Sequence, residues 1–480
     1  PPHDQSVAGL RAYQQAVLAS LGGRDRDVPL AEKAEFFEWQ IWRYHIGPHG
    51  QAMPRLNLPE QPGEPIVYGY GADISTWNGA LLAALSHKYA VTRDARTLSH
   101  IAELLEGMHL FFEATGQPGL PARVVLPTPN AATPHVFPAP DGETYHYRAE
   151  PAKGTLTQLV VGYAAMMMYV HPDLPEPIRS RAHRDLISLV LHLVRHDYQI
   201  TGLDGEPTRH GSLRPQILWY GVPFQSQVSY MLVAAAHEFP PDHPGQAEVI
   251  HEQFRRLRDR HPYWMPWWLP PFLPRPQRFP RSQILDANDL NHLVNATHTG
   301  LSLELFAARR EGREPDAELL RQLGETIYWS VERLDQQRNS LANFMCADLF
   351  ADPRFLAAAA RRNPDTVEQR LDVLLDQGVE QLRRFTLDRF RWEGLGYVTD
   401  TPNWADDFRP DSYLWKVEPL LAFEVTGPPT SMLYSAIDYL HAYWLLRHAG
   451  LDSAPAVLER HAEVLDVQPS RLEEARAEIR

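Results

Sequence analysis

The sequence predicts an all-α fold built from six helical hairpins. Apolar residues recur with the 3.6-residue period of a helix along most of the chain, and no run of alternating β-branched residues stands out as a strand. Short turns that carry Pro or Asp join the two helices of each hairpin, whereas mostly long, aromatic loops join successive hairpins. These long loops end at six positions, roughly 55 to 90 residues apart.

The pattern is clearest around residue 73. A loop rich in Gly and aromatic residues leads to Asp73, and apolar helices are expected over 74–91 and 95–114, on either side of the charged turn from Thr92 to Arg96. A long Pro-rich loop over 117–154 follows. Because long loops in a compact protein are usually functional, this arrangement also indicates where a site is to be sought.

The same cycle is expected to continue along the chain. The further helix pairs are 155–170 with 178–196, 223–238 with 247–260, 286–310 with 317–336, 341–360 with 367–385, and 430–448 with short helices after residue 452. We expect one domain over residues 1–480, in which N-terminal helices within 6–44 and C-terminal helices within 452–480 pack against the hairpins. If consecutive hairpins stand side by side, all long loops lie on one rim.

Six hairpins that close into a ring resemble the (α/α)6 toroid of the six-hairpin glycosidase-like superfamily. The segments DISTWNGALLAALSHKYAVTRD (73–94) and TGLDGEPTRHG (201–211) are similar to segments of uncharacterised bacterial members. The resemblance covers nearly the whole chain from about Ala31. It implies a toroid whose substrate lies at the rim with the long loops. Known activities of the superfamily are glycoside hydrolysis, polysaccharide lysis and sugar epimerisation, and related α-toroids cyclise or isomerise terpenoids. It assigns no catalytic residue to this chain.

Composition and charge weigh against several other classes of protein. The net charge is −14 and there is no Lys/Arg run, which argues against a nucleic-acid or anionic-membrane partner. No apolar window reaches the length of a membrane span. Cys346 is the only cysteine, so no intrachain disulfide and no Cys-based metal site is expected. The sequence has no HExxH, EF-hand or phosphate-loop pattern, and we expect neither a metal nor a cofactor.

The composition also bears on the source and location of the protein. Basic residues are almost all arginine, and with abundant Ala and Pro this is typical of a GC-rich bacterial genome. The chain starts PPHDQS without Met, which is compatible with a soluble protein of the bacterial cytoplasm and with one exported after loss of a signal peptide. The sequence carries no signal for an oligomeric state.

Carboxylates near the ends of the long loops are the candidate catalytic residues. Glycoside hydrolysis needs one carboxylic acid and a second carboxylate, and Asp73, Asp289 and Asp406 are suitably placed. Each has a structural alternative. Asp73 directly precedes a helix, where Asp is a preferred N-cap, and Asp289 lies in a first turn behind the expected cap Asp286. Asp406 belongs to an Asp-Asp turn that Arg409 is positioned to fix.

Aromatic residues next to these carboxylates are candidates for binding a sugar. Trp77 follows Asp73 by one helical turn and is a plausible stacking platform. Trp404 and Arg409 accompany Asp406 in the loop NWADDFRPDSYLW. An indole beside carboxylates and a guanidinium is a combination that suits sugar binding.

A polar stripe on the helix after residue 286 suggests a cavity wall. Asn288, Asn291, His292 and Asn295 follow the spacing i, i+3, i+4 and i+7, which places them on one helix face. A solvated face usually carries Lys, Glu and Arg instead. The stripe therefore predicts either a polar cavity wall, with His292 and Asn295 contacting substrate, or a satisfied buried hydrogen-bond network.

The loop YHYRAEPAKG suggests a different chemistry. Tyr145 and His146 offer bases, and Arg148 and Arg123 offer guanidinium groups that suit a uronate carboxylate. A polysaccharide lyase or an epimerase needs this combination to remove the proton beside a carboxylate. The alternative is an ordinary loop whose aromatic residues pack on the rim and whose arginines are solvated.

We therefore expect a carbohydrate-active enzyme whose partner is a glycan or another small-molecule substrate. A glycoside hydrolase that uses paired rim carboxylates is the first hypothesis, and a lyase or sugar epimerase that uses a Tyr/His base with Arg is the second. A terpenoid-type cyclase or isomerase is the third hypothesis, and a non-catalytic toroid that binds a glycan or a protein is the fourth. Two cavity-facing carboxyl groups about 5 to 10 Å apart would favour hydrolysis.

Overall fold

The computed structural model describes most of the chain. The described residues are 5–21, 23–68, 73–139, 142–215, 224–259, 287–333, 339–352, 354–355, 364–392, 395–398, 422–425 and 429–465. The structural statements below concern these residues.

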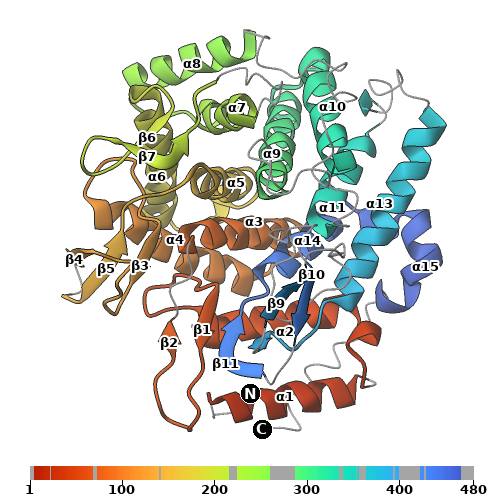
Figure 1. Ribbon diagram of the computed structural model, residues 1–480. Helices are drawn as coiled ribbons and strands as arrows, with labels where there is room; N and C mark the ends of the chain where they lie inside the picture. Colours follow the sequence, from red (N-terminus) through yellow and green to blue (C-terminus); the bar gives the residue numbers. More distant parts are fainter. Residues whose placement is uncertain are drawn as a thin grey trace.

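Six helices form an inner ring, and a second layer of helices surrounds them (Figure 1). The inner helices are α3 (Ile74–Thr92), α5 (Lys153–Tyr169), α7 (Phe224–Glu238), α9 (Ala287–Glu311), α11 (Ser340–Phe350) and α14 (Ile437–His448). The outer helices are α4 (Ala95–Thr115), α6 (Glu176–Arg195), α8 (Pro244–Asp259), α10 (Ala317–Arg333), α13 (Pro364–Arg384) and α15 (Pro455–Leu465). Neighbouring inner helices pack against one another, and α14 packs against α3, which closes the ring. The predicted all-α toroid of six hairpins is confirmed.

The two layers differ in burial in the way their sequences require. Almost every residue of α3 and α5 is buried, because a helix that is apolar all round must be enclosed by other elements. In the outer helix α8 the buried residues are Ile250, Phe254 and Leu257, which form one narrow stripe. The apolar stripe of an outer helix therefore faces the ring.

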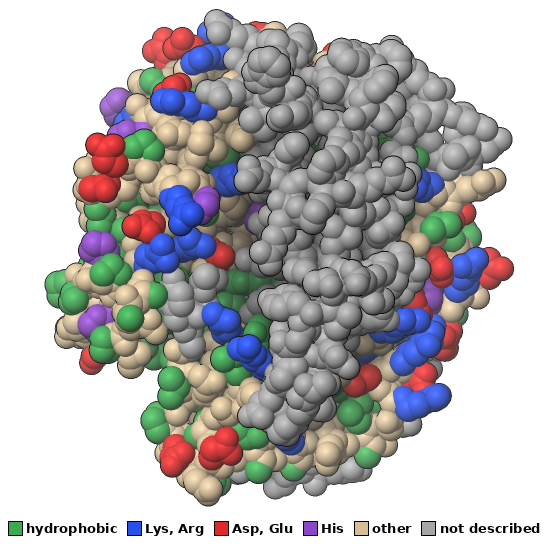
Figure 2. Space-filling model, in the orientation of Figure 1, with side chains coloured by type: hydrophobic (Ala, Val, Ile, Leu, Met, Phe, Trp, Pro, Cys, Tyr) green, Lys and Arg blue, Asp and Glu red, His purple; other side chains and the backbone are tan. Residues whose placement is uncertain are grey.

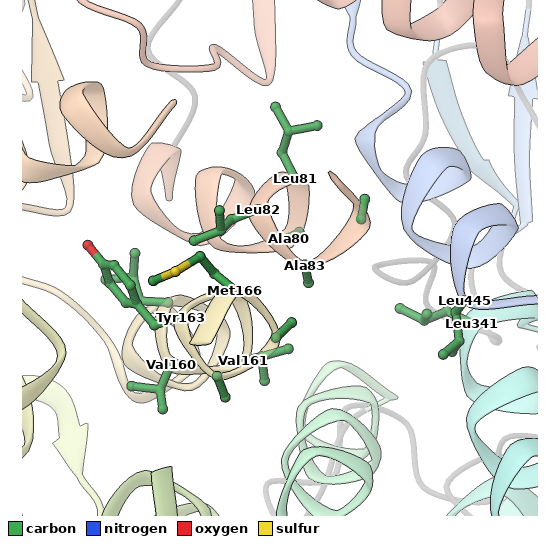
Figure 3. Close-up of a cluster of buried hydrophobic side chains, with 14 of the residues drawn as sticks. Ala80, Leu81, Leu82, Ala83, Val160, Val161, Tyr163, Met166, Leu341 and Leu445 are labelled. Carbon is green, nitrogen blue, oxygen red and sulfur yellow. The ribbon is translucent and has the colours of Figure 1, made fainter. Parts of the chain in front are cut away.

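The closest helix contact in the ring joins α3 and α5. A Cβ atom at Gly79 would lie 2.3 Å from the carbonyl oxygen of Gln158, and one at Gly162 would lie 2.4 Å from the carbonyl oxygen of Gly79. Glycine at both positions therefore lets the two backbones touch. Figure 3 shows Ala83 of α3 and Met166 of α5 in the space between these helices.

The inner helices run in the same direction, so their N-termini share one rim. Near these N-termini, Thr76 of α3 contacts Thr155 of α5. Near the C-termini, the rings of His87 and Tyr169 lie against that of His448. The long connections therefore lie on the N-terminal rim of the ring and the short turns on the other, as predicted.

The long connections contain short strands, which corrects the expectation that no strand is present. One sheet has the order β2 (Val67–Tyr68), β1 (Arg55–Asn57), β11 (Pro429–Tyr434) and β8 (Phe390–Trp392), and another has the order β3 (Val124–Leu126), β5 (Thr144–Arg148) and β4 (His135–Pro138). Two-stranded sheets pair β6 (Gln199–Thr201) with β7 (Pro207–Ser212), and β9 (Leu395–Val398) with β10 (Ala422–Val425). Strands of two to six residues are too short to show an alternating pattern in the sequence.

A turn at Asp204-Gly205 joins β6 to β7, and Gly205 has a φ of 81° there, in keeping with Asp-Gly as a strong turn signal. The helix expected to start at residue 430 is wrong: residues 429–434 form β11, and α14 begins at Ile437. Antiparallel pairing of β11 with β1 and β8 overrides the local preference there.

The N-terminal helices pack on the outside of the ring. Helix α1 (Val7–Ser20) precedes α2 (Leu30–Gln40), which continues into a π-helical turn at Ile41–His45. The buried amine of Lys33 on α2 donates to the carbonyl oxygens of Arg383 at 2.6 Å and Phe385 at 2.7 Å, at the end of α13. The hydroxyl of Tyr439 on α14 donates to the carbonyl oxygen of Leu30 at 2.9 Å. The domain limits of 1 and 480 stay a prediction, and residues 466–480 lie outside the described chain.

Candidate functional site

Asp73 lies at the rim, at the N-cap position of α3, and is held in an unusual conformation. Its φ is 76° and its ψ is 36°, in the left-handed region that residues other than glycine rarely adopt. Its side chain makes no capping hydrogen bond to α3. Instead, Nε and Nη2 of Arg123 contact Oδ1 of Asp73 at 2.7 and 2.5 Å. The side-chain cap that was one of the two expected roles of Asp73 is therefore not formed, because the carboxylate turns to Arg123.

Arg123 also fixes the start of α3 through its backbone. Its carbonyl oxygen accepts hydrogen bonds from the backbone N–H of Ser75 at 3.3 Å and from the Ser75 hydroxyl at 3.0 Å. Its own N–H donates to the carbonyl oxygen of Arg148 at 2.8 Å. The side chains of Asp73 and Arg123 are 17% and 18% exposed. The end of the β3–β5 ladder and the N-terminus of α3 thus form one anchored unit at the rim.

A group of buried polar side chains continues along this rim. We call it the polar collar, and it consists of Thr76, Thr155, Asn291, His292, Asn295 and Asn339, each at most 3% exposed. These residues lie near the N-terminal ends of four inner helices, α3, α5, α9 and α11. Thr76 donates to Thr155 at 3.4 Å, and Asn339 at the N-cap of α11 donates to Asn291 of α9 at 3.4 Å.

Three residues of the polar stripe predicted on α9, Asn291, His292 and Asn295, belong to this collar, and the side chain of Asn288 is outside the described residues. His292 packs so closely on α5 that a Cβ atom at Gly154 would lie 2.6 Å from its Nε2. The amide nitrogen of Asn295 donates to the carbonyl oxygen of Asn291 at 2.8 Å, while its Oδ1 accepts no hydrogen bond from the described residues. The amide nitrogen of Gln158 on α5 likewise donates no hydrogen bond to the described residues. Buried polar atoms that still have hydrogen-bonding capacity are what a polar cavity wall offers to a ligand or to water.

The two aromatic candidates that the structure describes, Trp77 and Tyr145, are buried. Trp77 is 1% exposed and belongs to the main hydrophobic core, so its indole offers no open face for stacking on a sugar. Tyr145 on β5 is also 1% exposed, and its hydroxyl contacts the imidazole of His49, with Nδ1 at 2.7 Å. The loop with His49 lies on the outer helix α4, because a Cβ atom at Gly107 would lie 2.6 Å from the carbonyl oxygen of His49. Sequence reasoning did not select His49, and nothing in the sequence links it to position 145.

The basic candidates of the loop after Tyr145 are accessible. His146 and Arg148 alternate along β5 with the buried Tyr145 and Tyr147, so they lie on the other face of the strand. Arg148 is 34% exposed and contacts Glu150 at 2.7 Å. On the described part of the face in Figure 2, Lys and Arg side chains are interspersed with Asp and Glu, in keeping with such pairs.

Several candidates fall outside what the structure describes. Trp404, Asp406 and Arg409 belong to the undescribed segment before β10. The backbone of Asp289 lies in the first turn of α9, but its side chain is outside the described residues.

Sequence reasoning missed one carboxylate at this rim. Asp438 is 1% exposed and lies in the first turn of α14. The start of α14 is tied to α3 through residues 52–54: Ser435 N–H donates to the carbonyl oxygen of Pro54 at 2.9 Å, and Asn78 of α3 bonds to the N–H and carbonyl of Ala52 at 2.8 and 2.9 Å. A helix over 430–448, as expected from the sequence, would place position 438 in its middle and away from the rim. The true start of α14 is the signal that identifies it.

A second polar cluster lies deeper in the ring, toward the C-termini of the inner helices. The ring centroid of His87 is 6.1 Å from that of His441 and 4.9 Å from that of His448. Burial lowers the pKa of His441 to about 3 and that of His87 well below its usual value, and the neighbouring imidazoles add to both effects. We call His87, His298, His441 and His448 the histidine cluster.

A cavity of about 430 Å³ opens among α7, α8, α9 and the α9–α10 turn. Two ion pairs form within its wall: Arg258 contacts Asp316 at 2.5 Å, and Arg313 contacts Glu304 at 2.7 Å. The residues of the α9–α10 turn in its wall place it at the rim with the short turns, opposite Asp73. None of the site residues expected from the sequence lines it.

Within the described part of the chain, no group of three or more His, Cys, Asp and Glu residues is arranged to hold a metal ion. None of the helices that the structure describes combines the length and the apolarity that crossing a membrane requires.

No protein-family model and no curated protein matches this sequence. Among solved structures, the chain is similar to an inactive variant of an alpha-1,6-mannanase of Salegentibacter sp. in complex with alpha-1,6-mannotriose, with 11% identity and a TM-score of 0.41 over 88% of this chain and 99% of that one. It is similar to an unsaturated glucuronyl hydrolase specific for heparin, with 9% identity and a TM-score of 0.43 over 88% of this chain and 97% of that one. It is also similar to a glycoside hydrolase family 76 mannosidase from Bacteroides thetaiotaomicron, with 11% identity and a TM-score of 0.41 over 90% and 99%.

The observed ring of six hairpins is the fold that the resemblance to the six-hairpin glycosidase-like superfamily implied. At these identities and TM-scores no residue role is transferred from the three proteins to this chain.

Proposed function

We propose that this chain is a carbohydrate-active enzyme and, within that class, a glycoside hydrolase that uses carboxylates at the N-terminal rim of the inner ring. The observation that carries the proposal is the state of Asp73. Its carboxylate is mostly buried, is bound by a guanidinium, and is carried by a backbone in the left-handed region. Such conformations persist where the surroundings impose them, and they are common at functional sites.

The polar collar supports the same location. Sugar hydroxyls need donors and acceptors that are held in place and shielded from bulk water. The imidazole of His292 is buried beside the first turn of α5, and the amide of Asn295 is buried and bound to the carbonyl oxygen of Asn291 on the same helix. We assign substrate contacts to His292 and Asn295. His146, Arg148, Trp404 and Arg409 remain candidates for further contacts.

Hydrolysis needs a second carboxyl group besides Asp73. Asp289 and Asp438 lie in the first turns of α9 and α14, where the helix dipole stabilises negative charge, and both helices begin at the rim of Asp73. Asp406 lies in the connection that leads toward α14. We propose that the partner of Asp73 is one of these three residues.

The test is activity on a panel of neutral and uronate-containing oligosaccharides in both anomeric configurations. The wild-type chain is compared with Asp73→Asn, Asp289→Asn, Asp406→Asn and Asp438→Asn, and new reducing ends are measured. Loss of a catalytic acid or base lowers the rate by about 10²- to 10⁴-fold, so we expect this loss for Asp73→Asn and for one further variant. Asp242→Asn, in an exposed turn, is the control and should retain wild-type activity.

Each other result points elsewhere. Unsaturated products from the wild-type chain would replace the hydrolase with a lyase. Full activity of Asp73→Asn would remove Asp73 from the mechanism. Glycan binding without turnover would identify a non-catalytic binding toroid.

A further inference from the structure

We propose that Arg123 is a positioning residue that keeps Asp73 ionised, so that Asp73 acts as the base or nucleophile of the proposed reaction and not as its acid. This inference rests on the proposed function and assigns roles within the same site. It also changes the role of Arg123, which the sequence suggested as a contact for the substrate.

Arg123 and Asp73 form a close, partly buried ion pair. The Nε–H of Arg123 donates a hydrogen bond to Oδ1 of Asp73 at 2.7 Å, and Nη2 of the same guanidinium lies 2.5 Å from that oxygen. A hydrogen bond in which both partners are charged is stronger than a neutral one, and an adjacent opposite charge favours the ionised carboxylate. Because both side chains are less than a fifth exposed, water screens this attraction far less than it screens a surface pair.

Backbone hydrogen bonds hold Arg123 in place beside α3. The carbonyl oxygen of Arg123 is bound by both the backbone and the hydroxyl of Ser75, two residues after Asp73. The N–H of Arg123 is bound to Arg148 on β5. The guanidinium therefore approaches Asp73 from a backbone that is itself fastened to α3. The left-handed backbone of Asp73 directs its carboxylate away from the cap position and toward this partner.

Asp73 lies at the N-terminal end of α3. The N-terminal end of a helix carries partial positive charge, which favours an anion there. The guanidinium and the helix end thus both favour the ionised form, and they must outweigh the cost of partly burying the charge. A general acid must instead hold its proton at the working pH, which usually requires an apolar or negatively charged environment.

An ionised Asp73 can take part in glycoside hydrolysis in two ways, as a base or as a nucleophile. As a base, Asp73 accepts a proton from water while the water oxygen forms a bond to the anomeric carbon. The bond from that carbon to the leaving oxygen breaks, and a second carboxylic acid gives its proton to the leaving oxygen. Asp73 then returns its proton to solvent, and the second carboxylate takes one up. As a nucleophile, Asp73 would bond to the anomeric carbon while the bond to the leaving oxygen breaks and the second carboxylic acid protonates that oxygen. In a second step, water would give a proton to the second carboxylate and bond to the same carbon, and the bond to Asp73 would break.

The experiment has one arm that needs no substrate. Aspartate is labelled with ¹³C at the carboxyl carbon, and the full-length chain is titrated by NMR from about pH 8 down to the lowest pH at which circular dichroism shows the folded chain, with the signal of Asp73 assigned by its loss in Asp73→Asn. We expect the wild-type midpoint to lie below the ordinary value for Asp of about 3.9. In Arg123→Gln the midpoint should move to higher pH by about one to two pH units, and Arg123→Lys should restore most of the change.

A matched control lies at the other end of the same helix. Arg93, directly after α3, contacts Asp173 at 3.2 Å, and its removal in Arg93→Gln should leave the midpoint of Asp73 unchanged. Thermal unfolding of each variant shows whether it is folded. If Asp73 titrates at the same pH in Arg123→Gln as in the folded wild-type chain, the inference is overturned.

The second arm is the pH profile of kcat/KM on a glycan that the panel identifies. We expect the acidic limb of the profile to move to higher pH in Arg123→Gln, and to return with Arg123→Lys. A raised KM with an unchanged profile would overturn the inference and make Arg123 a substrate contact. If no glycan is turned over, the proposed function fails and the base role fails with it, whereas hydrolysis with an unshifted profile overturns the inference alone.

Discussion

Nε2 of His298 on α9 lies 2.7 Å from Oδ2 of Asp348 on α11. This contact lies at one side of the histidine cluster, whose other members come from α3 and α14. The histidine cluster thus has four imidazoles and the carboxylate of Asp348. Tyr169 of α5 and Arg309 of α9 are further titratable groups near this cluster. Burial lowers the pKa of His87, His441 and His448, so these residues are neutral in the folded chain at neutral pH.

We expect the fold to lose stability as the pH falls below about 6.5. The folded-state pKa of these histidines is lower than the unfolded value, so the unfolded chain binds more protons in this range. Their contribution to stability is complete above the unfolded pKa and decreases as the pH falls toward the folded value, about 3 for His441. Each such histidine removes about 1.4 kcal/mol per pH unit. Urea unfolding at pH 8 to 4 measures the slope.

The variant His441→Phe tests the source of this slope. It keeps a ring of similar size and removes one titrating group, so the slope below pH 6.5 should decrease by about 1.4 kcal/mol per pH unit. His243→Gln, at an exposed position before α8, is the control and should follow the wild-type curve. Parallel curves for His441→Phe and wild type would show that His441 does not contribute.

Lys33→Met should destabilise the fold by about 3 kcal/mol. The amine of Lys33 donates to the carbonyl oxygens of Arg383 and Phe385, and Met keeps the apolar stem but leaves these buried acceptors without the donor. The free energy of unfolding in denaturant measures the loss, and Glu35→Gln on the exposed face of α2 is the control. A loss below about 0.5 kcal/mol would mean that water or the chain replaces the amine without cost.

Gly79→Ala should cost about 2 to 3 kcal/mol, because the added methyl group would lie 2.3 Å from the carbonyl oxygen of Gln158 and the two helices must separate. Gly245→Ala in the first turn of α8 is a control, since the nearest atoms to its Cβ are those of the exposed His243 ring at 3.3 Å. Its stability should stay within about 1 kcal/mol of wild type. Thermal unfolding of both variants provides the comparison, and equal stabilities would contradict close backbone contact.

Asp73→Gly and Asp73→Ala separate the strain at this position from its charge. Both remove the carboxylate and the contact with Arg123, but glycine adopts a φ of 76° without the clash that alanine has. The glycine variant should therefore be about 1 kcal/mol more stable than the alanine variant, while both lack hydrolytic activity. Denaturant unfolding decides the first point, and an alanine variant of equal stability would show that the backbone is relaxed there.

The sequence predicted the helices well because the helical period of apolar residues repeats over a long stretch in each of them. The helix expected over 74–91 is observed at Ile74–Thr92, and the one expected over 155–170 is observed at Lys153–Tyr169. It failed where partners distant in the chain decide the structure. Residues 429–434 form a strand because β1 lies beside them, some 375 positions earlier in the chain.

The site was less predictable than the fold for the same reason. A propensity scale assigns Asp73 to a cap, and nothing local shows that Arg123, in a loop that returns after a full hairpin, will take the carboxylate instead. Trp77 was plausible as a stacking platform because indoles bind sugars, but its position on an inner helix encloses it. Placing the polar stripe of α9 needed no distant partner, and that residue set was found from its spacing.

The glycines at the α3–α5 contact also affect how the ring can respond to a ligand. Where backbone lies on backbone, there is no layer of side chains to repack, so these two helices cannot slide past each other by exchanging rotamers. Asp73 and Arg123 are held at the N-terminal end of this rigid helix pair. Any change in the width of the ring would therefore come from the helices opposite α3 and α5, while these two keep their positions.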